Sequence, residues 1–262
     1  MPGVLSLART AWRHRTVLVH FVLRDLRVKY RGTVFGYLWS LLEPLSLVLI
    51  YWFVFVVVAR RGGPDYPLVV VLGVLPYQLF SQIVQGGAAS LVGNAALIRR
   101  VYLPRELFVL GLVGSATATF LLSLIAVVPF LVLFGASPGW GLWLAPLGLL
   151  GLLALATGLA LGLACLNAVY RDVGYVLRVL TRLAFYASPV IYPVAMVPEA
   201  LRAAYLLNPL ALYLNLLRSG VMGFAPALGP FEALWAAGWA VGAFLVGVWA
   251  FRRWEAEAVK FL

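Results

Sequence analysis

Charged residues are scarce in this chain of 262 residues. Only 11% of its residues are charged and 64% are hydrophobic, and the mean hydropathy is +0.99. A water-soluble domain is about one quarter charged and about half apolar. The composition therefore excludes a water-soluble fold and an intrinsically disordered chain, and it indicates a membrane protein.

Cysteine, histidine and lysine are also nearly absent. The single cysteine, Cys165, lies in an apolar run, which excludes disulfides and favours a packing role. The two histidines, His14 and His20, both lie near the N-terminus, so no histidine cluster can hold a metal. Neither Lys29 nor Lys260 is followed by serine or threonine, so the chain lacks a phosphate-binding P-loop. We therefore expect the chain itself to bind no metal or cofactor.

Long apolar runs occupy most of the sequence. A helix that crosses the hydrocarbon core, about 30 Å thick, needs about 20 mostly apolar residues. Six runs are candidates: residues 33–59, 67–92, 107–134, 142–166, 174–192 and 233–250. The sequence predicts an all-α membrane protein with six transmembrane helices in a single domain, and no signal peptide is expected before the first run.

Basic residues are distributed unequally among the connections between these runs. Sixteen of the twenty lie in the first 31 residues, between the second and third runs, around the junction of the fourth and fifth, and in the C-terminal tail. The other four are Arg60, Arg61, Arg202 and Arg218. Because basic connections stay in the cytoplasm, both termini are predicted to be cytoplasmic in an inner membrane. The net charge of +11 is assigned to this orientation and not to nucleic-acid binding.

Residues 15–31 mix charge and apolarity at helical spacing. One predicted face is apolar and consists of Val19, Val22, Leu23, Leu26 and Tyr30. Another face is basic and consists of Arg24, Arg27 and Arg31. This pattern predicts a helix in the cytoplasmic interface, with its basic face toward anionic lipid headgroups. A plain basic tail would not need so regular an apolar stripe.

Residues 193–230 do not fit one spanning helix. Pro189, Pro193 and Pro198 interrupt the chain, and Asn208-Pro209 stops the helix that follows them. Ten residues of helix cover about 15 Å, which is half a bilayer. We predict two short helices that dip in from the outer side and return, beside protein or water, as at the mouth of a pore.

Glu43 is the one acidic residue well inside an apolar run, and Pro44 follows it directly. A carboxylate near the bilayer centre costs about 2.5–3.5 kcal/mol on insertion scales, so it faces a cavity or a partner. Glu43 is therefore either a pore residue or a structural acid that bonds to groups freed by the Pro44 kink. The chain has only nine acidic residues, too few at membrane depth for an enzyme that holds Mg²⁺ against a diphosphate lipid.

The fifth run carries a stripe of basic and aromatic residues on one helix face. Its members are Arg171, Tyr175, Arg178, Arg182, Phe185 and Pro189. The stripe is either an entrance for an anionic headgroup or a set of arginines that snorkel to the interface. Arg178, about one turn from the interface, favours snorkelling, whereas Arg182, two turns in, favours a site.

Aromatic residues are dense along the first run. They are Phe35, Tyr37, Trp39, Tyr51, Trp52, Phe53 and Phe55. Most lie near the two ends of the run, as an interfacial aromatic belt predicts. Stacking against sugar rings is the alternative, and the sequence alone does not choose.

Several motifs, in order along the chain, resemble those of ABC-2-type membrane subunits that export polysaccharides, such as O-antigen and teichoic acid. The matching segments are residues 25–30 (DLRVKY), 35–44 (FGYLWSLLEP), 97–106 (LIRRVYLPRE), Asn167 with 170–175 (YRDVGY), 188–193 (SPVIYP) and 208–210 (NPL). Each motif is weak alone, but they occur in order along the sequence, so the resemblance extends over nearly the whole chain. One departure is Phe35, where the family more often has leucine.

The resemblance implies a homodimer that forms a channel for a lipid-linked polysaccharide, with ATP and Mg²⁺ held by a separate cytoplasmic ATPase dimer. Residues 94–105 would form the coupling segment, and the implied coupling residues are Leu97, Ile98, Arg99, Arg100, Tyr102, Pro104, Arg105 and Glu106. The substrate path would use Tyr37, Trp39, Glu43, Arg171, Tyr175, Arg178, Arg182 and Phe185. The outer gate would use Ser188, Pro189, Tyr192, Asn208 and Pro209. Arg182 is expected to meet the diphosphate of the lipid carrier.

Three other functions stay open at this point. An ABC-2 exporter of a small drug or lipid would share the architecture, and substrate dependence would separate the two. A polyprenyl-phosphate enzyme would show metal-dependent turnover, which the shortage of acidic residues disfavours. A purely structural membrane subunit would need no coupling segment.

Overall fold

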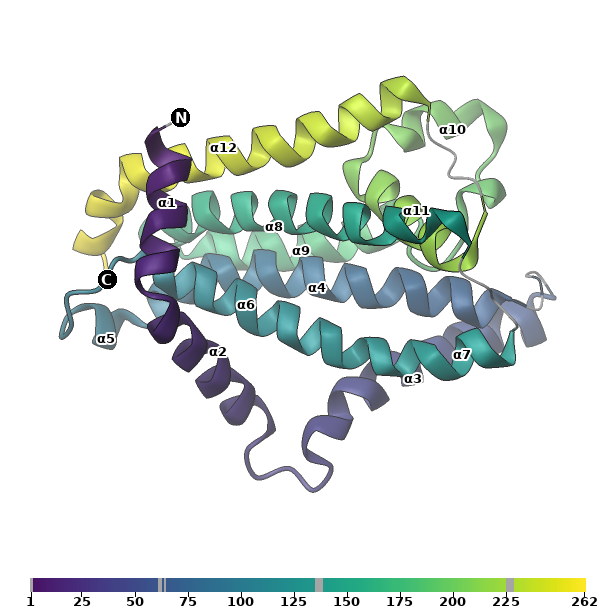
Figure 1. The fold of residues 1–262 in the computed structure, drawn as a ribbon, viewed down its shortest axis with the longest axis horizontal. Helices are drawn as coiled ribbons and strands as arrows, with labels where there is room; N and C mark the ends of the chain where they lie inside the picture. Colours follow the sequence, from purple (N-terminus) through teal and green to yellow (C-terminus); the bar gives the residue numbers. More distant parts are fainter. Residues whose placement is uncertain (1, 61–62, 64, 135–138, 225–228) are drawn as a thin grey trace.

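Long helices lying side by side form the body of the molecule (Figure 1). The computed structural model describes residues 2–60, 63, 65–134, 139–224 and 229–262, and this part contains no strand. Five helical segments within it are long and apolar enough to cross a membrane. They are α3 (Trp39–Trp52) with η2 (Phe53–Val58), α4 (Tyr66–Gly93), α6 (Glu106–Ser123) with η3 (Leu124–Ala126) and α7 (Val127–Leu133), η4 (Trp140–Trp143) with α8 (Leu144–Val169), and α12 (Pro230–Lys260).

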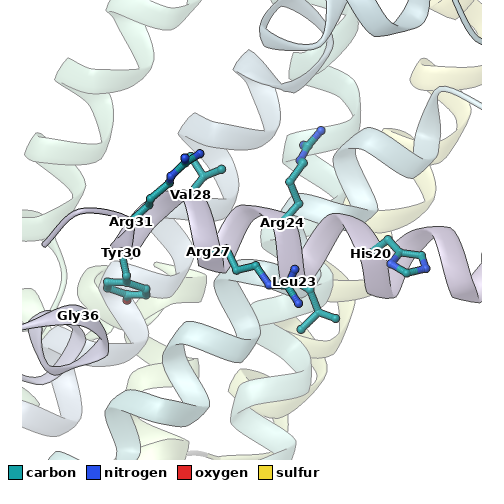
Figure 2. Close-up of a pocket in the computed structure, with 8 residues that line it drawn as sticks. All are labelled: His20, Leu23, Arg24, Arg27, Val28, Tyr30, Arg31 and Gly36. Atoms are coloured by element: carbon teal, nitrogen blue, oxygen red, sulfur yellow. The ribbon is translucent and has the colours of Figure 1, made fainter.

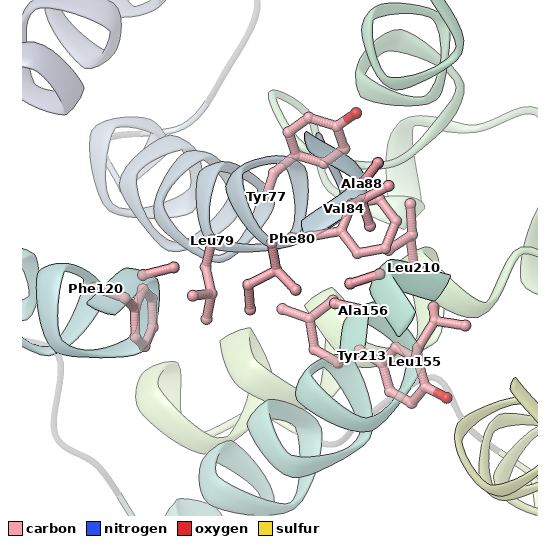
Figure 3. Close-up of a cluster of buried hydrophobic side chains, with 14 of the residues drawn as sticks. Tyr77, Leu79, Phe80, Val84, Ala88, Phe120, Leu155, Ala156, Leu210 and Tyr213 are labelled. Atoms are coloured by element: carbon pink, nitrogen blue, oxygen red, sulfur yellow. The ribbon is translucent and has the colours of Figure 1, made fainter. Parts of the chain in front are cut away.

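Helix α4 lies at the centre of the bundle and is buried along most of its length. Figure 3 shows how its side chains meet those of three neighbours: Phe120 comes from α6, Leu155 from α8, and Tyr213 from α11 (Pro209–Met222). Helices in lipid gain little from the hydrophobic effect, so tight packing and small residues hold them together. The fully buried leucine, valine and isoleucine side chains of α4 supply that packing.

Helices α8 and α12 approach each other closely at glycine. A side chain at Gly247 of α12 would overlap the backbone of Gly158 in α8, and one at Gly158 would overlap the backbone at Ala243. Only glycine permits this separation, because any Cβ would push the two backbones apart. Gly242, one turn away, has open space around it.

The fifth predicted run is a shorter helix than the others. Helix α9 (Asp172–Ala187) has 16 residues and ends five residues before the predicted boundary at 192. It ends there because Ser188 is extended and precedes Pro189, whose ring disfavours a helical conformation in the preceding residue. At about 1.5 Å per residue, α9 is about 24 Å long.

Short helices occupy the outer segment after α9. They are η5 (Val194–Met196), α10 (Glu199–Leu206) and α11. Helix α10 follows Pro198, and Asn208 separates it from α11 by accepting a hydrogen bond from the Leu210 amide as an N-cap (3.0 Å). The predicted gate range 193–230 includes residues 225–228, which lie outside the described residues.

Two helices precede the first long one. Helix α1 (Pro2–Arg13) was not expected, and it contacts α12, with Gly3 beside Val248. Helix α2 (Arg15–Tyr30) leaves the bundle, and α3 returns to it after a short connection that contains η1 (Gly36–Leu38) (Figure 1). Both termini and α5 (Ala95–Ile98) lie at one end of the bundle, opposite α10.

Helix α2 has a third face that the sequence pattern did not reveal. Val19 and Leu23 are exposed, as are Arg24 and Arg27. Phe21, in contrast, stacks on Phe108 of α6 at a ring separation of 5.3 Å. Aromatic packing against α6 therefore anchors α2, while Val19, Leu23 and the basic face stay exposed. The rest of the predicted apolar face is not free, because Tyr30 is buried and Val22 lies beside Gly114 of α6.

Candidate functional site

Helix α9 is exposed along most of its length and carries Arg178 and Arg182 among exposed apolar residues. Among its residues only Leu177 and Thr181 are buried. The Arg178 guanidinium lies 4.5 Å above the Tyr175 ring, and both side chains are exposed. Arg182 is also exposed and makes no hydrogen bond to another described residue. The predicted stripe thus keeps Tyr175, Arg178 and Arg182 on a free face.

The two ends of that predicted stripe lie elsewhere. Phe185 packs in an aromatic cluster with Tyr77 at 5.1 Å and Tyr51 at 6.1 Å, between α9, α4 and α3. Arg171 donates to the Phe261 carbonyl (3.3 Å) in the C-terminal tail. The structure therefore does not bring all six stripe residues onto one accessible surface.

Polar side chains of α4 hold α9 in place. Gln85 donates to the Thr181 hydroxyl (2.8 Å), and Tyr77 donates to the Thr181 carbonyl. At the start of α9, Asn167 of α8 donates to the Ala88 carbonyl (3.0 Å) and accepts from the Gly174 amide (2.9 Å). Because an unpaired polar group is unfavourable in an apolar interior, these bonds fix α9 against α4.

Arg218 of α11 organises the outer segment. Its side chain is 3% exposed and donates to four backbone carbonyls, those of Val69 (3.0 Å), Tyr192 (3.2 Å), Pro189 and Val190. No carboxylate of a described residue forms an ion pair with it. A planar guanidinium has five N–H donors and can bond four carbonyls at once, whereas a lysine ammonium has only three donors.

The residues predicted for the outer gate surround this arginine. Ser188 and Pro189 are buried, and Ser188 accepts a hydrogen bond from the Asn208 amide (2.9 Å). The Tyr192 hydroxyl donates to the Tyr186 carbonyl (2.9 Å) and contacts the Tyr205 hydroxyl. Pro209 occupies the first turn of α11. The predicted gate residues therefore cluster.

Sequence reasoning missed Arg218 and counted it only as an outer cation. The available signal was a single arginine within an otherwise uncharged 14-residue helix between Asn208 and Gly223. A charge in such a segment needs buried partners, and here the partners are backbone carbonyls.

The cytoplasmic segment presents some of its predicted residues and holds others. Leu97 and Ile98 rest against the core, whereas Tyr102 is 100% exposed and Arg100 is exposed. Arg99 donates to the Leu262 carbonyl. The accessible part of this segment is therefore its tip, from Arg100 to Tyr102.

The remaining coupling residues lead into α6. Pro104 and Arg105 are partly exposed and directly precede that helix. Glu106 is 8% exposed, and its carboxylate lies 3.6 Å from Arg252 of α12. These residues join the segment to the bundle and present little surface.

The remaining candidates lie on α3 and in the connection before it. Trp39 is half exposed and meets Phe35 edge to face at 5.7 Å. The side chain of Tyr37 lies outside the described residues. Glu43 lines a groove of about 600 Å³ together with Lys29 and Gln82.

The basic face of α2 borders a second hollow, of about 710 Å³. Its lining includes His20, Arg24, Arg27 and Arg31 (Figure 2). Figure 2 shows Arg24 and Arg31 extending to one side of the helix and Arg27 to the other. The guanidinium groups therefore do not converge on one point, and they form a basic surface instead of a pocket for a single anion.

No group of histidine, cysteine, aspartate and glutamate suited to a metal occurs in the described part of the chain. What the arrangement offers is a bundle of apolar helices with charged and polar side chains on α9, on α2 and in the groove beside Glu43. This is the organisation of a polytopic membrane protein that handles a polar partner or ligand.

Comparison with known proteins identifies the family. A sequence profile of the ABC-2 type transporter family matches residues 16–222. The chain is 32% identical over 209 residues to the O-antigen export system permease protein RfbA of Myxococcus xanthus, an alignment that covers 79% of this chain and 80% of the relative. It is 24% identical over 231 residues to the polysialic acid transport protein KpsM of Escherichia coli, covering 82% and 85%. The chain therefore belongs to the ABC-2 type transporter family of membrane proteins.

Proposed function

We propose that this chain is the membrane-spanning permease subunit of an ATP-driven exporter that moves a lipid-linked polysaccharide out of the cytoplasm. The observation that carries the proposal is its similarity, over about four fifths of both chains, to a permease named for O-antigen export. The lack of a P-loop fits a division of labour in which a separate ATPase binds ATP and Mg²⁺. The membrane is the inner membrane, with both termini in the cytoplasm.

The surfaces of α3 and α9 support a homodimer. Helix α3 with η2 is mostly exposed, and α9 exposes Arg178 and Arg182 beside apolar residues. Arginine at membrane depth is unfavourable toward lipid, so this face of α9 needs protein or water. A second copy of the chain, packed against α3 and α9, would surround these arginines with protein and would enclose a water-filled channel. In this arrangement α9 is the sixth span, short because its neighbours shield it from lipid.

The outer segment supports a pair of re-entrant helices. At about 1.5 Å per residue, the eight residues of α10 cover about 12 Å and the 14 of α11 about 21 Å, so neither crosses a bilayer. The backbone between α9 and α10 is bonded by Arg218 and by Tyr66, which donates to Ile191 (2.8 Å). These bonds satisfy backbone carbonyls of a non-helical segment, to which lipid offers no hydrogen bond.

Docking of the ATPase is assigned to the tip of the cytoplasmic segment. We expect Arg100→Glu with Tyr102→Ala to abolish copurification of the ATPase while the permease still inserts, because both side chains are free to contact a partner. Tyr170→Ala is the matched control, since Tyr170 is a 63% exposed tyrosine near the same end of the bundle. Arg99 is less suitable for this test because it already binds the C-terminal tail. Equal copurification with all three proteins would contradict the docking assignment.

Export itself is tested in cells of the source organism that lack this chain. We expect lipid-linked polysaccharide to accumulate inside these cells and to reach the surface when the chain is restored. An absence of polymer in the deletion strain would indicate an enzyme, and unchanged pools inside and outside would indicate a different cargo.

A further inference from the structure

A polar groove crosses the apolar body of the protein between α2, α3, α4 and α6. It has a volume of about 600 Å³ and continues into a smaller hollow that shares several of its residues. Its polar lining includes Lys29 of α2, Glu43 of α3, Gln78 and Gln82 of α4, and Ser115 and Thr119 of α6. Four helices therefore contribute polar side chains to one place.

The groove lies deep within the helices that span the membrane. Gln82 is 11 residues from the cytoplasmic end of α4 and 16 from the other end, or about 17 and 24 Å along the helix axis. At this depth the surroundings of the bundle are hydrocarbon. A polar side chain here must bond to protein, water or a ligand.

Three of the lining side chains have no hydrogen-bond partner among the described residues of the protein. Gln78, Gln82 and Glu43 make no side-chain hydrogen bond to another described residue. Gln85, one turn from Gln82, is in contrast paired with both Ser81 and Thr181. Gln78 and Gln82 thus keep hydrogen-bond donors and acceptors that contacts within the described part of the protein do not use.

The charge of the lining selects among polar ligands. The carboxylate of Glu43 offsets the ammonium group of Lys29, and Asp25, which also borders the groove, is paired with Arg24 at 2.9 Å. The groove therefore has no excess positive charge for a diphosphate. Carboxamides and carboxylates, with the lone pairs of Ser115 and Thr119, suit a ligand that both donates and accepts hydrogen bonds at many points.

We propose that this groove binds the uncharged, hydroxyl-rich sugar units of the transported glycan, and that it is filled with water when no glycan is present. The proposal rests on the function proposed above and names the part of the cargo that the groove contacts. When glycan binds, its sugar hydroxyls displace this water and form hydrogen bonds to Gln78, Gln82 and Glu43. The phosphate end of the cargo lies elsewhere.

Hydration of the groove is tested first, with cysteine labelling in membranes. Cys165 is buried and is replaced by alanine, and single cysteines are then placed at Gln82 and at Leu121. Leu121 of α6 is 53% exposed at a comparable depth, but outside the groove. A charged, membrane-impermeant thiosulfonate should label the cysteine at 82 at least about tenfold faster than that at 121, because thiolate forms only in contact with water. Equal rates would overturn the proposal.

Ligand chemistry is tested by export and by protection. Gln82→Leu removes the hydrogen bonds and should lower surface glycan about tenfold, whereas Gln82→Glu keeps an acceptor for hydroxyls and should lower it less. Copurification of the ATPase should be unchanged in both variants. Labelling at position 82 should also be slower in cells that make the glycan than in cells that do not.

The outcomes separate this proposal from the proposed function. If Gln82→Leu exports normally while the wild-type chain restores export, the groove assignment is wrong and the exporter assignment stands. If Gln82→Glu lowers export more than Gln82→Leu does, the groove binds the phosphate and the sugar assignment is wrong. If the wild-type chain restores no export, the proposed function itself fails.

Discussion

Replacement of Arg218 by methionine should destabilise the protein more than any other single loss of an arginine in the outer segment. The guanidinium donates to four carbonyls, and each charge-assisted bond contributes about 1.5–3 kcal/mol. Burial of the guanidinium offsets several kcal/mol of that gain, because a charge is removed from water. The net loss expected for Arg218→Met is about 3–5 kcal/mol.

The assay is thermal unfolding of the purified permease in lipid nanodiscs. A loss of this size should lower Tm on the order of 10 °C in a chain of this length. Arg202→Met is the matched control, because Arg202 lies in the same segment and donates one bond of 3.4 Å, to Val197. Arg218→Lys should fall between the two, since an ammonium cannot reach all four carbonyls. Equal Tm values for Arg218→Met and Arg202→Met would refute the view that Arg218 holds the outer segment together.

Two further substitutions test the packing of α8. Gly247→Val should destabilise the protein by about 1–3 kcal/mol, because its side chain would overlap Gly158, whereas Gly242→Val should have little effect at an open site; chemical unfolding of both variants checks this. Asn167→Ala should cost about 1–3 kcal/mol because it removes two hydrogen bonds, to the Ala88 carbonyl and from the Gly174 amide, that join α8 to α4 and α9. Faster hydrogen exchange at the start of α9 should accompany that loss, and unchanged exchange would contradict the role of Asn167.

Hydropathy predicted the long helices because lipid imposes a simple length requirement on each apolar segment. The exposed part of α3 lies within a predicted run, and α4 and α8 each overlap a predicted run over most of their length. Boundaries were less accurate where local turns decide them. Helix α9 ends at Ala187 and not at Tyr192, although Pro189 was a visible signal for that end.

Contacts between distant segments could not be predicted from the spacing of residues in the sequence. The glutamines of α4 recur every three or four residues, and so do Ser115, Thr119 and Ser123 of α6. Each stripe is visible alone, but that they line one groove depends on how α4 and α6 are rotated in the bundle. Arg218 is a similar case, because its partners are carbonyls from α4 and from the segment after α9.

The free surfaces of α3 and α9 differ in a way that orients the proposed channel. The exposed residues from Leu49 to Val58, in α3 and η2, are apolar or aromatic, so lipid or protein can cover them. Helix α9, which meets α3 at the Tyr51–Phe185 contact, exposes two arginines. A polar cargo interacts more favourably with these arginines than with the apolar surface of α3. We therefore expect the path to follow the charged side of α9 and the groove beside Glu43, and α3 to seal it from lipid.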